Sequence, residues 1–200
     1  KRAARAWEEG RFAKSVVAVK DQLGTTILDH DEHMRPGTDM QSLGALKPSF
    51  KDQGEVMPGF DKIALMKYPH LERIEHIHHA GNSSGVVDGA AALILSNKAY
   101  ADKVGWKPRA RIVAMATVGG DPTLMLNEPV PAAQKALARA GMTTDDIDLF
   151  EINEAFSVVA AKFIRDLALD PAKVNVNGGA MALGHPIAAT GSILIGTILD

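Results

Sequence analysis

The sequence predicts an α/β protein whose core is a layered sheet covered by helices. The 200 residues are 46% apolar, which is enough to bury a substantial core. In the second half of the chain, short apolar runs alternate with segments of helical periodicity, an order typical of α/β layers. Glycine and proline separate these segments, and no internal repeat is evident at the usual solenoid periods. These observations together favour a layered α/β fold.

The first 107 residues predict short elements joined by long loops. Paired breakers such as Pro36-Gly37 and Pro58-Gly59 make the segment 25–67 loop-rich. Gly105 stops a helix that follows a short apolar run. The expected elements are helices over 1–9 and 97–104 and strands over 15–19, 74–79 and 90–95.

A second unit begins after Lys107-Pro108. Its clearest helix has Pro131 near the start and Gly141 just past the end, which is the usual placement of these residues. Thr143 or Thr144 caps a short turn after it. The expected elements are strands over 111–118, 147–152 and 174–176 and helices over 130–140, 153–169 and 188–199.

Composition excludes several classes of function. A net charge of −2 gives no electrostatic footprint for nucleic acid. No apolar run is long enough to span a bilayer, and the basic N-terminus lacks the apolar core of a secretory signal. The chain contains no cysteine, which excludes disulfides, thiolate metal sites and a cysteine nucleophile within these residues. We expect a cytoplasmic protein without a transmembrane segment.

The segment 177–186 carries the strongest chemical signal. It places His185 on a glycine-rich loop just before an apolar helix, with Pro186 stiffening the next step. A histidine held in this way can act as a general base or as a hydrogen-bond donor to an oxyanion. A tight loop whose histidine only bonds its surroundings is the alternative.

Two further segments are candidates for ligand contacts. Asn153 follows an apolar strand, where open α/β sheets place ligands, although asparagine is also a good helix N-cap. Residues 80–85 are small or hydroxylated and suit either an extended ligand or an ordinary turn. His76 and His78 share one face of a predicted strand, but no suitably spaced acidic residue adjoins them. We therefore predict no metal site.

These motifs together resemble those of the thiolases, the acyl-CoA C-acyltransferases. The motif Asn-Glu-Ala-Phe at 153–156 is followed by Gly-Gly-Ala-x-Ala-Leu-Gly-His-Pro at 178–186. Ala-Gly-Asn-Ser-Ser-Gly at 80–85, with Asp-Gly-Ala-Ala at 88–91, is similar to the family's coenzyme A contact segment. The order and spacing agree along essentially the whole chain, and the joint occurrence of the motifs is highly specific.

The resemblance implies a role for each matching residue. His185 matches the histidine that activates a nucleophilic cysteine and lines the oxyanion hole, and Asn153 matches the asparagine that holds a water there. Ser84 matches a contact to the pantetheine arm of coenzyme A. The other matching positions are Phe156 in the acyl pocket, Phe50 beside the coenzyme A arm, and Ala80, which begins the contact segment.

The resemblance also implies a domain arrangement and shows where this chain departs from the family. The thiolase fold is a layered αβαβα structure. Residues 1–79 match part of the loop domain, 80–107 the end of the N-terminal half, and 108–200 most of the C-terminal half. Thiolases carry two catalytic cysteines and this sequence has neither, which predicts an internal piece of a thiolase polypeptide. Ala188 stands where the family usually has glycine.

The implied reaction is thiolytic cleavage of 3-ketoacyl-CoA by coenzyme A through an acyl-cysteine. The segment 51–79 is longer than in short biosynthetic thiolases and resembles the thiolase subunits of fatty-acid-oxidation complexes. It could accommodate a longer acyl chain or contact a partner or a membrane surface, and the alternative is a solvated surface loop. We expect no cofactor, since coenzyme A is a substrate. The implied partners are a second or further copies of the chain, in a homodimer or homotetramer, and a hydratase/dehydrogenase subunit. The alternatives are a biosynthetic acetoacetyl-CoA thiolase and a non-catalytic relative that binds coenzyme A or lipid.

Overall fold

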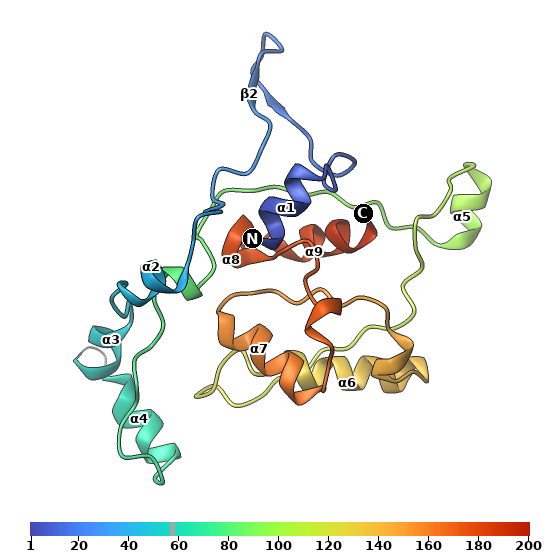
Figure 1. Cartoon of the computed structure of the whole chain (residues 1–200). Helices are drawn as coiled ribbons and strands as arrows, with labels where there is room; N and C mark the ends of the chain where they lie inside the picture. The colour runs from blue at the N-terminus through green and yellow to red at the C-terminus, as the bar shows by residue number, and fades with distance from the viewer. Residues whose placement is uncertain (57–58) are drawn as a thin grey trace.

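The computed structural model describes residues 1–56 and 59–200. Met57 and Pro58, which belong to the predicted extended segment, lie outside the described residues. Helices dominate the regular structure (Figure 1). The α-helices are α1 (Arg2–Glu8), α2 (Met40–Gly44), α3 (Lys51–Glu55), α4 (Phe60–Lys67), α5 (Lys98–Lys103), α6 (Pro129–Ala140), α7 (Ser157–Asp166), α8 (Ala180–Leu183) and α9 (Thr190–Leu199). The strands are β1 (Val19–Lys20) and β2 (Thr26–Leu28), and the 3-10 turns are η1 (Ala80–Asn82), η2 (Thr144–Asp146) and η3 (Pro171–Lys173).

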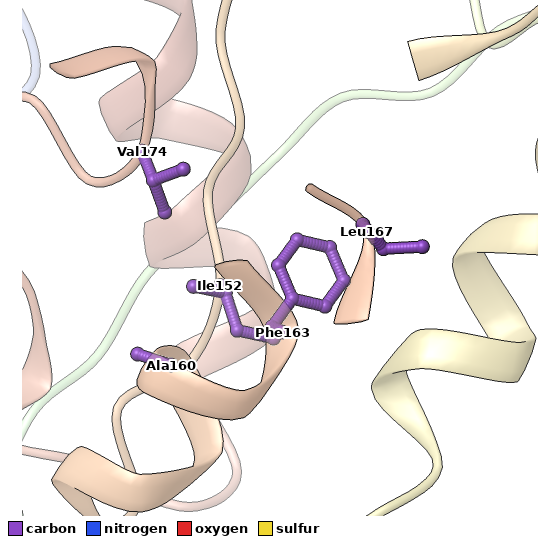
Figure 2. Close-up of a cluster of buried hydrophobic side chains, with 5 residues drawn as sticks. All are labelled: Ile152, Ala160, Phe163, Leu167 and Val174. Carbon is purple, nitrogen blue, oxygen red and sulfur yellow. The ribbon is translucent and has the colours of Figure 1, made fainter. Parts of the chain in front are cut away.

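The core lies between α7 and the backbone segments on either side of it. Val174 is 1% exposed and Phe163 is 5% exposed. The remaining buried members of the cluster are Ile152, Ala160 and Leu167 (Figure 2). Phe150 packs edge-on against Phe163, with ring centroids 6.2 Å apart, and α6 packs beside α7. Apolar burial on this scale is the main stabilising term of the second half of the chain.

A parallel backbone pairing crosses this core. Phe150 bonds to the carbonyl of Lys173, and Asn175 bonds to the carbonyl of Phe150, both at 2.9 Å. The predicted strands 147–152 and 174–176 are therefore neighbours, linked by α7, as an α/β unit requires. The pairing amounts to one bridge instead of two full strands, so the described backbone forms a shorter ladder than the sequence predicts.

Helix α1 packs on the glycine loop that precedes α8, although the two are far apart in sequence. Ala3 and Ala6 are each 1% exposed. Arg2 donates to the carbonyl of Val174 at 2.6 Å, and Arg11 donates to Oδ1 of Asn177 at 2.9 Å. Gly178 has φ +84°, and a Cβ there would lie 2.6 Å from that of Ala3. A glycine at 178 is what allows the helix to approach this closely.

Several predicted helices are confirmed. Helix α6 ends at Gly141, which has φ +67°, and Asn97 caps α5 by accepting from the amide of Tyr100. Thr143 forms a capping box with Asp146 in the predicted turn. The prediction that a helix begins at Asn153 is wrong, because α7 begins at Ser157 with Phe156 in the N-cap position. The side chain of Asn153 therefore does not cap the helix, and Glu154 lies before the first helical turn.

The strand predictions in the first two thirds of the chain are largely wrong. Of the predicted strand 15–19, only Val19 is in a strand; Ser15 ends a turn and residues 16–18 have no regular structure, and the observed hairpin pairs β1 with β2, Val19 opposite Leu28. Among the described residues, 74–79, 90–95 and 111–118 form no regular strand. A strand needs a ladder partner for its N–H and C=O groups, and these segments find none within the part of the chain that the structure describes.

The predicted loop-rich segment 25–67 contains three helices. Asp39 caps α2 by accepting from the amide of Ser42 at 2.8 Å. Helices α3 and α4 contact each other and extend away from the body of the molecule, in the lower left of Figure 1. We call residues 51–56 and 59–67, which contain these two helices and one flanking residue of each, the α3–α4 arm. The arm corrects the prediction that loop dominates this part of the segment 25–67.

Candidate active site

The structure brings the two principal site candidates into contact. His185 follows α8 and Asn153 precedes α7, yet Nδ2 of Asn153 lies 3.3 Å from Nε2 of His185. Oδ1 of Asn153 is buried and has no hydrogen-bond partner among the described residues. A buried acceptor without a partner is costly unless a donor reaches it. The amide of Asn153 therefore faces the imidazole on one side and offers an acceptor on the other.

Thr190, at the start of α9, determines which nitrogen of His185 carries the proton. Its Oγ1 lies 2.6 Å from Nδ1 of His185 and donates to the carbonyl of Pro186 at 3.0 Å. A hydroxyl has one proton, and that proton goes to the carbonyl, so Oγ1 accepts from Nδ1–H. In the neutral ring Nε2 is then unprotonated, and its lone pair points to the Asn153 amide. This is the tautomer that a general base needs.

A buried polar network holds the backbone on both sides of Asn153. Asn175 is 2% exposed; its Oδ1 accepts from the amide of Ile152, and its Nδ2 donates to the carbonyl of Ile152. The same Nδ2 group donates to Oε1 of Glu154 at 2.8 Å, and Oε2 of Glu154 accepts from the amide of Met181 at 3.2 Å. A Cβ at Gly179 would collide with this carboxylate. The network ties the Asn153 segment to the loop that presents His185.

The segment that contains Ser84 lies against both halves of this pair. The amide of Ser84 donates to the carbonyl of Ala155, and the amide of His185 donates to the carbonyl of Gly85, both at 2.9 Å. Ser83 also bridges to Phe156 in antiparallel fashion. Two main-chain contacts therefore place the Ser84 segment beside the Asn153–His185 pair.

Three rings gather beside Ser84. Phe50 packs edge-on against Phe156, with ring centroids 5.8 Å apart, and His78 packs on the same phenyl ring at 5.0 Å. The amide of Ser49 donates to the carbonyl of His78 at 2.8 Å, which aligns the two segments. Phe50 and Phe156 were expected in the site. His78 was considered only as a metal ligand, and the alternation of 74–79 gave no sign of this aromatic contact.

A large cavity lies beside the Asn153–His185 pair without including it. Its volume is about 990 Å³, and Ala80, Gly81, Glu154 and Gly179 form part of its lining. Ala80 therefore faces this cavity, whereas Ser84 lies on the side of His185. The pair, and not the cavity, holds the imidazole that contacts the amide and the unpartnered acceptor.

Glu151 is a titratable group near the site that sequence reasoning did not single out. Burial raises the pKa of its carboxyl to about 7, and the neighbouring Glu154 carboxylate adds to the shift. Its Oε2 atom is buried without a hydrogen-bond partner among the described residues. Desolvation of this kind favours the protonated carboxyl.

Similarity to known proteins agrees with this geometry. Residues 1–61 match the model of the N-terminal thiolase domain, and residues 106–200 match that of the C-terminal thiolase domain. An acetyl-CoA acetyltransferase of Shinella zoogloeoides is 42% identical over 196 residues, which are 97% of this chain and 44% of that protein. A 3-ketoacyl-CoA thiolase of Saccharophagus degradans is 40% identical over 206 residues, which are 100% of this chain and 47% of that protein.

A solved structure supports the same assignment. The crystal structure of human mitochondrial 3-ketoacyl-CoA thiolase superposes with a TM-score of 0.82 at 36% identity, covering 99% of this chain and 45% of that one. The chain belongs to the thiolase family, and the predicted thiolase fold of the α/β class is confirmed. It spans less than half the length of the relatives it matches. Among the described residues, no helix has both the length and the apolar character needed to cross a bilayer.

Proposed function

We propose that this chain supplies the acid–base and substrate-binding half of an acyl-CoA C-acyltransferase. The reaction is the thiolytic cleavage of 3-ketoacyl-CoA by coenzyme A, through an acyl-cysteine. The observation that supports it most directly is the contact between Asn153 and Nε2 of His185, together with the contact between Thr190 and Nδ1 of the same ring. Acyltransferase relatives of 40–42% identity support the same reaction class.

Each step assigned to this chain follows from a named atom. Nε2 of His185 takes the proton of the attacking thiol, which makes the thiolate nucleophile. The protonated ring then donates to the negative oxygen that develops on the thioester. Oδ1 of Asn153 accepts from a water whose other proton completes the oxyanion hole, which satisfies the buried acceptor.

Substrate contacts follow from the same arrangement. Ser84 and Ala80 contact the coenzyme A arm, while Phe50 and Phe156 contact the arm and the acyl chain. Coenzyme A is a substrate in this scheme, and no metal or cofactor takes part. The thiol nucleophile is a cysteine, and since these 200 residues contain none, it comes from outside them. In the proposed whole enzyme, residues 1–79, 80–107 and 108–200 supply parts of the loop domain and of the two thiolase halves.

The deciding experiment uses the polypeptide that carries these residues together with the nucleophilic cysteine. His185→Ala should lower kcat for thiolysis by about 10³-fold or more, because it removes both the base and an oxyanion donor. The dissociation constant for coenzyme A should stay within about twofold. His70→Ala, at an exposed histidine of the same chain, is the matched control and should leave both values unchanged. Retained thiolysis in His185→Ala would remove the ring from the mechanism.

We propose a degradative role in fatty-acid β-oxidation, on the resemblance of segment 51–79 to the subunits of oxidation complexes. Biosynthetic acetoacetyl-CoA formation is the close alternative, and relatives of both names match this chain. Rates with 3-ketoacyl-CoA of graded chain length separate the two, since a β-oxidation thiolase cleaves long chains. A non-catalytic protein that binds coenzyme A or lipid would bind the substrate without cleaving it. A homodimer or homotetramer, a hydratase/dehydrogenase partner and a cytoplasmic location stay predictions.

A further inference from the structure

Three side chains of metal-binding type converge at the base of the α3–α4 arm. Glu55 ends α3, Asp61 lies in the first turn of α4, and His76 lies in the extended segment that follows. One donor atom from each lies within 4.8 Å of the other two. Nε2 of His76 is 2.8 Å from Oδ2 of Asp61. Elsewhere in residues 1–56 and 59–200, no other three histidine, aspartate or glutamate side chains gather this closely.

The side chains of His76 and Asp61 are held in place by the fold. They are only 13% and 16% exposed, respectively. The imidazole lies directly on Gly54, where a Cβ would collide with the ring. Glu55 is more exposed and faces Lys51, whose Nζ is 3.8 Å from its carboxylate. Two carboxylates and a neutral imidazole carry a formal charge of −2, which complements a divalent cation.

The spacing also fits a single ion. Donor atoms about 2.0–2.2 Å from a zinc ion lie at most about 4.4 Å from one another. The three donor atoms all lie within 4.8 Å of one another, so side-chain rotation alone can bring them around one ion. One nitrogen and two oxygen donors suit a first-row transition ion better than calcium or magnesium, which prefer oxygen alone.

We propose that Glu55, Asp61 and His76 bind one divalent transition-metal ion, of which Zn²⁺ is the best match. The ion joins α3, α4 and the segment around residue 76 into one unit, and water completes its coordination. This role is structural and is separate from the acyl-transfer chemistry.

Apart from contacts of Lys67 and Tyr68 with Asp121 at the end of α4, the two helices of the arm bury little that would stabilise them. Helices of five and eight residues are marginal on their own in water. Gly54 and Ala64 are the only buried residues of the two helices among those described. Ile63 and Met66 are 55% and 83% exposed. Units without a core are commonly held by disulfides or metal ions, and this chain has no cysteine. The proposed ion adds a direct bond from each of the three segments to the contacts that α3, α4 and His76 already make.

Zinc titration of the metal-free chain by isothermal calorimetry tests the proposal. We expect one tight Zn²⁺ per chain in the wild type. His76→Ala and Asp61→Asn should each weaken binding at least about 100-fold, because each removes a direct ligand. His30→Ala is the matched control: His30 lies 2.7 Å from Asp29, an exposed histidine–aspartate pair outside the triad, so its loss should leave the affinity within about twofold.

Hydrogen exchange on the wild-type chain gives a second readout that does not depend on how the variants fold. One equivalent of Zn²⁺ should slow amide exchange in 51–56 and 59–67 and leave α6 unchanged. Absence of a one-to-one site, equal affinity in wild type and both ligand variants, or no slowing in the arm would each overturn the proposal. A plain His76–Asp61 ion pair predicts those results. Neither readout requires thiolase activity, so this proposal and the proposed function fail independently.

Discussion

Asn175→Ala tests whether one buried amide holds the Asn153 side of the site. The substitution removes two hydrogen bonds to the backbone of Ile152 and one to the Glu154 carboxylate. The neutral bonds contribute about 1 kcal/mol each and the charge-assisted bond about 1.5–3 kcal/mol. Residue 175 also has φ +48°, which costs alanine about 1 kcal/mol more than asparagine. We therefore expect a loss of about 4–6 kcal/mol in the free energy of unfolding.

Urea unfolding measured in parallel for wild type and variants checks this value. Asn177→Ala is the matched control, because Asn177 is also buried but accepts one hydrogen bond, from Arg11. That variant should lose about 1.5–3 kcal/mol. In Asn175→Ala the nuclear magnetic resonance signals of the His185 ring should also shift, since the Asn153 amide loses its support. A loss below about 1.5 kcal/mol, or one equal to that of the control, would refute the reasoning.

Two further predictions concern a carboxyl and a glycine. The folded-state pKa of Glu151 is raised to about 7, so wild-type stability falls as pH rises from about 4.5 to 7. With solvent screening included, the free energy of unfolding of the wild type should fall by about 1–2 kcal/mol between pH 5 and 8. Glu151→Gln should remove most of this fall in urea unfolding, and an unchanged pH dependence would contradict the prediction. Gly178→Ala should speed amide exchange in α1, because the new methyl meets Ala3. Gly191→Ala is the control: its new methyl has no atom within 4 Å and should leave exchange in α1 unchanged. Equal exchange rates in the two variants would disprove the close contact at Gly178.

The sequence predicts the site better than the sheet. Motif spacing correctly groups Asn153, His185, Ser84 and Phe156, because each lies next to a turn or helix end whose local signals are strong. Helix α6 is recognisable for the same reason, since Gly141 marks its end. The roles of these residues in catalysis stay predictions until activity is measured.

The wrong predictions concern contacts that the local sequence does not determine. The apolar runs 90–95 and 111–118 satisfy the pattern of buried strands, but a pattern does not supply a partner strand. The start of α7 is misplaced because asparagine is a good N-cap, whereas here the amide of Asn153 faces His185. His76 has no suitably spaced acidic residue next to it in the sequence, and only the fold brings Asp61 to it.

The link between Thr190 and the imidazole has a mechanical consequence. Thr190 opens α9 and is 6% exposed, so the position of its hydroxyl is set by the helix. The direction of the His185 lone pair is therefore coupled to the orientation of α9. Any contact that tilts the first turn of that helix would rotate the imidazole relative to the Asn153 amide.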